Sequence, residues 1–101
     1  MTMDLADLTF ELAEPHAGEA FTLVRGDERD ELELAEVAAL TGEHLPEGFR
    51  RPFSMVFRGG LDLELAQGIH ALEHPALGTL ELFLVPIGPD EHGTRFEAVF
   101  A

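Results

Sequence analysis

The sequence predicts an all-β, mainly antiparallel fold: a small half-open barrel of six or seven strands with one short N-terminal helix. Three observations lead to this prediction. Apolar and polar residues alternate with a period of two in segment after segment. Turn signals containing Gly or Pro separate these segments at short intervals. A chain this short protects its strand edges best by closing on itself, which favours a barrel over a two-sheet sandwich.

Composition limits the possible functions of this chain. Its 101 residues predict a single domain, 1–101, large enough to form a core without disulfides or metal, and it contains no Cys. The net charge of −14 comes from 20 acidic residues against six basic ones, all Arg. Nucleic acids and anionic membranes would be repelled by such a surface. Because no signal peptide or membrane-spanning segment is evident, we expect a cytoplasmic protein.

The only expected helix lies near the N-terminus. Residues 1–8 form a mixed lead that we expect to fray. Thr9 is a good N-cap for a helical turn over 10–14, and Pro15 with Gly18 should end it. The apolar side of this turn, with Phe10 at its start, should plug one open end or edge of the sheet.

The first half of the chain then changes to strand periodicity. A strand begins at Glu19, and a second runs over residues 31–40 after a polar turn. Alternation slips by one residue between Leu34 and Ala35, which predicts a β-bulge, although residues 34–40 also fit a helical turn. Residues 41–52 read as an exposed loop.

The second half contains the clearest strands. Residues 53–58 alternate with a heavy aromatic face, and residues 69–74 form another strand. The segment 61–65 also alternates, but it fits either a short strand or an extended loop. A long strand over 79–87, a turn and a last strand over 94–100 complete the domain.

The strand over 79–87 has two different faces. Leu80, Leu82 and Leu84 share one face and should belong to the core. The opposite face turns apolar at Phe83, Val85 and Ile87, so the second half of the strand is either buried on both sides or exposes an apolar patch used for contact. Pro86 cannot donate a ladder hydrogen bond, so it should mark an edge, a bulge or the end of the strand.

Several motifs resemble a family of small bacterial domains of unknown function, about 100 residues long. They are Phe57-Arg58-Gly59, Gln67-Gly68, His74-Pro75-Ala76-Leu77-Gly78, Leu82-Phe83-Leu84-Val85-Pro86 and Glu97-Ala98-Val99-Phe100. The sequence departs from the family pattern at His70 and Phe96, where members often carry Tyr. The resemblance implies no assigned activity and motifs made of turn and core residues. It also implies a structural or accessory role near phage-tail-like assemblies.

The candidate sites in this sequence are modest. His70 and His74 would be about 13 Å apart on a strand, too far to share one metal, so His74 is expected to bond backbone in a turn. The turn 90–92 lacks the oxygen pattern of a calcium loop. Arg50, Arg51 and Arg58 concentrate positive charge and could dock an acidic partner, or pair with the protein's own acids.

These observations favour a non-enzymatic structural or protein-interaction domain, accessory to a phage-tail-like assembly, with a protein partner or self-association. We expect no catalytic residues, no cofactor and no metal. The contact candidates are Phe83, Val85, Ile87, Arg50, Arg51 and Arg58. Two alternatives stay open: a barrel that binds an apolar ligand among Phe53, Phe57, Phe96 and Phe100, and an acidic DNA-mimic inhibitor.

Overall fold

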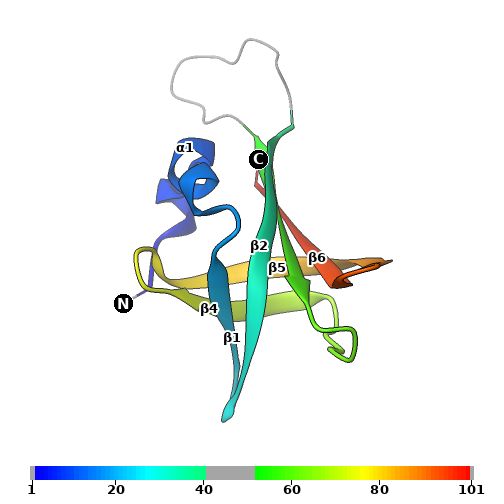
Figure 1. The fold of residues 1–101 in the computed structure, drawn as a ribbon. Coiled ribbons are helices and arrows are strands. Elements are labelled where there is room, and N and C mark those ends of the chain that lie inside the picture. Colours follow the sequence, from blue (N-terminus) through cyan, green and yellow to red (C-terminus); the bar gives the residue numbers. More distant parts are fainter. Residues whose placement is uncertain (1, 41–51, 101) are drawn as a thin grey trace.

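A computed structural model describes residues 2–40 and 52–100 of the chain. Six strands form a closed antiparallel barrel in the order β1-β2-β3-β6-β5-β4 (Figure 1). The strands are β1 Ala20–Arg25, β2 Glu28–Ala39, β3 Phe53–Gly59, β4 Gly68–His74, β5 Gly78–Asp90 and β6 Gly93–Phe100. The predicted antiparallel β-barrel is therefore confirmed. The strand count is six because segment 61–65 follows a loop path between β3 and β4.

The barrel is closed rather than half-open, because β1 pairs with β4 over three residue pairs. One part of the wall is nevertheless loose. The β5–β6 ladder begins only at Val85, so the first half of β5 and the end of β6 diverge. The N-terminal segment lies along the free side of β5, where the Met3 amide donates to the Thr79 carbonyl at 2.8 Å. The N-terminal segment thus extends the barrel wall beside β5, where β5 and β6 separate.

The N-terminal segment forms a compact cap. A 3-10 turn, η1 Leu5–Asp7, precedes the helix α1 Phe10–Ala13. The predicted cap is confirmed, since Thr9 Oγ1 accepts the Leu12 amide hydrogen at 3.2 Å. The expected fraying of residues 1–8 is not seen over the described residues 2–8, where the Met3 amide bonds Thr79 and Leu8 is completely buried in the core. Burial of this apolar side chain stabilises the segment on the barrel, although the acidic residues around it suggest an exposed segment.

The end of the helix also differs from the prediction. Pro15 does not end the helical segment, which continues as a 3-10 turn, η2 Glu14–His16. A proline fits the first positions of a helical turn because the amide hydrogen that it lacks has no acceptor there.

The N-terminus lies beside the turn between β4 and β5 (Figure 1). Within the described segments, no helix has the length and apolarity needed to cross a membrane.

Phenylalanine and leucine side chains fill the interior of the barrel. Phe21 and Phe57 meet edge to face with ring centroids 5.3 Å apart, and Phe53 stacks on Phe100 at 4.6 Å. These rings are among the most deeply buried side chains of the described segments, together with inward-facing leucines from β1, β2, β4 and β5. Of the aromatic residues that suggested a ligand cavity, Phe53 packs on Phe100, Phe57 packs on Phe21 and Phe96 is buried.

Two bulges bend the long strands around this core. The β2–β3 register shifts between Leu34 and Glu36, so the bulge predicted from the slip in alternation is confirmed. The β5–β6 register shifts between Pro86 and Gly88, which selects the bulge among the three alternatives for Pro86. An extra residue in one strand increases the local twist and bends the strand, as closing so small a barrel requires.

Candidate functional site

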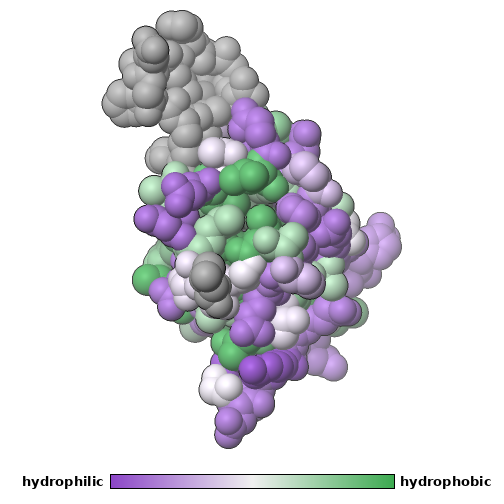
Figure 2. Space-filling view, turned by 90° about the vertical axis from the view of Figure 1, so that its left-hand side faces the viewer, coloured by the Kyte–Doolittle hydropathy of each residue, from purple (hydrophilic) through white to green (hydrophobic). Residues whose placement is uncertain are grey.

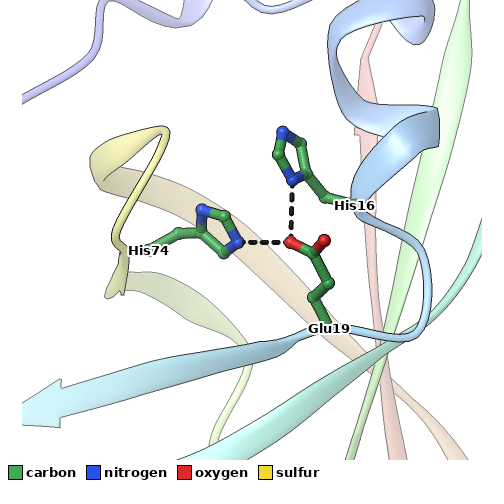
Figure 3. A group of neighbouring side chains, drawn as sticks. All are labelled: His16, Glu19 and His74. Atoms are coloured by element: carbon green, nitrogen blue, oxygen red, sulfur yellow. Dashed lines mark hydrogen bonds and ion pairs between the residues drawn. The ribbon is translucent and has the colours of Figure 1, made fainter.

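Two histidines and a glutamate from distant parts of the chain meet at one end of the barrel (Figure 3). His16 ends η2, Glu19 precedes β1 and His74 ends β4. Glu19 Oε1 accepts hydrogen bonds from His16 Nδ1 at 2.8 Å and from His74 Nε2 at 2.7 Å. These bonds, the one from His16 foremost, lower the pKa of the Glu19 carboxyl. We call this group the His–Glu clasp.

The second ring nitrogen of His74 has its own partners. Nδ1 accepts the backbone amide hydrogen of Ala76 at 3.0 Å and that of Leu77 at 3.3 Å. The expectation that His74 bonds backbone in a turn is therefore confirmed. Because Nδ1 accepts, the ring proton lies on Nε2, where it is donated to Glu19. One imidazole thus shapes the β4–β5 turn and also ties it to the segment before β1.

The donor set of the clasp superficially suits zinc, since His, His and Glu bind this ion in many proteins. The three candidate ligand atoms lie within 4.8 Å of one another. A metal-bound histidine normally donates its other N–H to an acceptor. His74 Nδ1 instead faces two N–H donors, so binding a cation through Nε2 would sacrifice both turn hydrogen bonds. The geometry therefore fits a hydrogen-bonded clasp rather than a metal centre.

Sequence reasoning missed this cluster. His74 lies 55 positions after Glu19, and no local pattern connects them. The pair that the sequence did consider, His70 and His74, does not come together in a site. His70 Nε2 instead lies 2.7 Å from the carbonyl oxygen of Ala66.

The predicted contact strand presents an exposed aromatic ring. Phe83 is 51% exposed, and Ile69, which stands directly opposite it on β4, is 70% exposed. Val85 and Ile87 are only partly exposed. Ile87 lies in the bulge, where the regular alternation of faces breaks down. Ile69 was not predicted, although the alternation of β4 would have placed it outside, opposite the buried Leu72.

Exposed apolar residues elsewhere do not pair in this way. On the side of the molecule that carries the N-terminus, apolar side chains form small patches separated by hydrophilic ones (Figure 2). Among the large exposed apolar side chains of the described segments, Ile69 and Phe83 are the two that face each other on neighbouring strands. We call the outward surface of these strands around Ile69 and Phe83 the β4–β5 face.

Arg58, the third arginine of the predicted basic patch, is occupied within the molecule. Its guanidinium donates twice to Asp90 Oδ2, at 2.7 and 3.1 Å, and once to Glu33 at 3.0 Å. Arg58 lowers the pKa of Asp90 to about 2, and the same bonds raise the pKa of the guanidinium. The sequence left two alternatives for this arginine, docking an acidic partner or pairing with the protein's own acids, and its contacts agree with the second. Arg50 and Arg51 lie outside the described residues.

The Asp90 carboxylate, at the acidic turn between β5 and β6, is also bonded within the molecule. Asp90 Oδ1 accepts the amide hydrogens of His92 and Gly93 at 2.8 and 3.0 Å. Its other oxygen is held by Arg58. Both carboxylate oxygens therefore stabilise the hairpin, and the turn does not present them as free ligands for a cation.

Comparison with protein families gives a match. A family model described as "Domain of unknown function (DUF6916)" matches residues 8–100. The chain belongs to this family. No curated protein and no solved structure matches this chain.

The motifs by which the chain resembles a domain of unknown function have structural roles in this DUF6916 member. His74 caps the β4–β5 turn, Leu77 is buried, and Gly78 adopts a φ of 79° that favours glycine. Phe57 and Phe100 belong to the core. The expectation that the motifs consist of turn and core residues agrees with these positions, whereas Phe83 and Val99 of the same motifs are exposed.

Proposed function

We propose that this DUF6916 domain is a non-enzymatic protein-interaction module that binds a partner through the β4–β5 face. The observation that carries the proposal is the exposed pair Ile69 and Phe83, which are direct cross-strand neighbours. Aromatic side chains on a rigid support are typical anchors of protein interfaces.

The support beneath this pair is well suited to binding. The residues that alternate with it, Leu72, Leu82 and Leu84, are completely buried in the barrel. The face therefore has little conformational freedom to lose when a partner covers it. Complete burial of a Phe or Ile side chain contributes about 1.5–3 kcal/mol, so covering this half-exposed pair would supply a useful central contact.

Two further observations favour binding over catalysis. His74 bonds Glu19 through one ring nitrogen and turn amides through the other, and Asp90 accepts from hairpin amides with one carboxylate oxygen and from Arg58 of β3 with the other. Polar groups held in this way are poorly placed to transfer protons to a substrate. The resemblance to small bacterial domains adds a setting for the module, an accessory place in a phage-tail-like assembly.

Comparative affinity capture tests this function. Lysate of the source organism would be passed over immobilised wild-type protein, a Phe83→Ser variant and a Leu61→Ser variant. Leu61 is a matched control, because it is 65% exposed but lies in the loop between β3 and β4. We expect a protein that wild type and Leu61→Ser retain and Phe83→Ser loses, and that binds purified wild type directly.

The opposite results are equally informative. If Phe83→Ser and Ile69→Ser retain every protein that wild type retains, the β4–β5 face is not the binding surface. The DNA-mimic alternative makes a different prediction, since duplex DNA should then compete with the captured partner whichever residue occupies position 83.

A further inference from the structure

The charges around the β4–β5 face indicate what kind of partner it binds. Resting on the proposed function, we propose that the partner presents an apolar side chain flanked by Lys or Arg, and that it is not a second copy of this chain.

Carboxylates lie on both sides of the apolar pair. Glu81 shares the outward face of β5 with Phe83, two residues away, which is about 6.6 Å along a strand. On the other side, Glu97 of β6 stands opposite Val85, the next outward residue of β5. A third carboxylate, Glu73, is exposed further along β4.

No positive charge on these two strands balances the carboxylates. Neither β4 nor β5 contains a Lys or Arg. Among the ion pairs of residues 2–40 and 52–100, none involves Glu73, Glu81 or Glu97. By contrast, Arg25 and Arg58 are bonded to acids that lie outside the β4–β5 face, and Arg95 of β6, two residues before Glu97, donates to the Gly88 carbonyl. The face therefore offers an apolar centre with an acidic rim that a basic partner would complement.

The same charges argue against self-association through this face. A two-fold pairing of identical faces would bring two copies of Glu81 and Glu97 into one interface. Each copy also carries a net charge of −14, which adds long-range repulsion. Like charges placed opposite one another destabilise strand and interface contacts. A basic partner removes both costs.

Fluorescence with designed peptides tests the charge of the partner. The chain contains no Trp or Tyr, so a Trp in the peptide reports binding without background. The first probe is a ten-residue peptide with central Trp and Val flanked by four Lys, and the second carries Glu at the four Lys positions. We expect only the Lys probe to bind, with amide shift changes at Ile69 and Phe83 in nuclear magnetic resonance spectra and weakening as salt is added.

Charge-reversal variants separate specific from general attraction. Glu81→Lys and Glu91→Lys have the same net charge, but Glu91 lies in the β5–β6 turn, away from the face. We expect Glu81→Lys to weaken Lys-probe binding about three- to tenfold and Glu91→Lys to change it less than twofold, as rim charges of an interface do. Phe83→Ser should abolish the shift changes at Ile69.

Three results would overturn the inference. Equal weakening by the two charge reversals would show general attraction to an acidic protein. Equal binding of the Glu probe would show that charge is not selected. A wild-type dimer in sedimentation equilibrium that Phe83→Ser disperses would make a second copy the occupant. None of these results rejects the β4–β5 face as a binding surface, a question that the capture experiment decides separately.

Discussion

The two nitrogens of His74 can be separated by substitution, and this makes the His–Glu clasp testable. In His74→Asn the amide oxygen occupies nearly the position of Nδ1, so the turn keeps its acceptor but loses the bond to Glu19. In His74→Gln the amide nitrogen reaches nearly the position of Nε2, so the bond to Glu19 remains and the turn loses its acceptor. His74→Ala removes both.

The magnitude follows from the contacts of the ring. Nδ1 accepts two backbone hydrogens, and each such bond contributes about 0.5–1.5 kcal/mol. The ring also packs on Phe21 with centroids 4.5 Å apart, and an aromatic contact of this kind contributes about 0.5–1.5 kcal/mol. At about 1 kcal/mol for each contact, His74→Ala loses the two turn bonds, the bond to Glu19 and the ring contact, so it should lower the free energy of unfolding by about 4 kcal/mol. His74→Gln keeps only the bond to Glu19 and should cost about 3 kcal/mol, whereas His74→Asn keeps the two turn bonds and should cost about 2 kcal/mol.

Urea unfolding followed by far-ultraviolet circular dichroism measures these differences, since the chain has no Trp or Tyr for intrinsic fluorescence. Hydrogen exchange at the Leu77 amide adds a local reading, with protection retained in His74→Asn and lost in His74→Gln. If His74→Asn is as unstable as His74→Ala, the turn bonds are not the main contribution. If zinc stabilises wild type but not His74→Asn, Nε2 is a metal ligand and the clasp interpretation is wrong.

Three further predictions concern stability. Phe83→Ser should change the free energy of unfolding by less than about 1 kcal/mol because Phe83 is half exposed, whereas Leu82→Ala, on the buried face, should cost about 2–5 kcal/mol in urea unfolding. A Cβ on Gly93 would collide with the backbone carbonyl oxygen of Gly59 in β3, so Gly93→Ala should cost about 3 kcal/mol or prevent folding. Gly60→Ala, with no atom within 4 Å of the added Cβ, should be nearly neutral by the same measurement. The pKa of Asp90 is depressed to about 2, so its contribution to stability is present above pH 4 and lost as pH falls toward 2. In Asp90→Asn this part of the acid-induced loss, measured as the urea midpoint against pH, should disappear.

Local periodicity accounts for most of what could be predicted about the fold. A strand that packs one face on a core must alternate, so the inward Leu80, Leu82 and Leu84 were identifiable from spacing alone. The one-residue shift in the apolar–polar alternation after Leu34 predicted a bulge for the same reason, since an extra residue reverses the alternation. His74 was predictable in its turn because its acceptor role involves residues only two and three positions away.

The prediction failed where the physical cause is long-range. Residues 1–8 carry acids that suggest an exposed lead, yet Leu8 is fully buried in the core cluster of the barrel. Its burial depends on how the N-terminal segment packs on distant strands, which no local pattern reveals. Ile69 was likewise overlooked, because its importance depends on standing opposite Phe83.

The β class, the capping of the helix by Thr9 and the outward position of Phe83 follow from the amino-acid sequence alone, as does the order of the strands along the chain. These features depend on alternation and on hydrogen bonds between near neighbours, both of which short segments of sequence contain. The pairing of β1 with β4, the contact of His16 and Glu19 with His74, and the bonding of Arg58 to Asp90 are visible only in the folded chain. Such meetings depend on register and closure, which the packing of the whole core selects from many pairings that are locally equivalent.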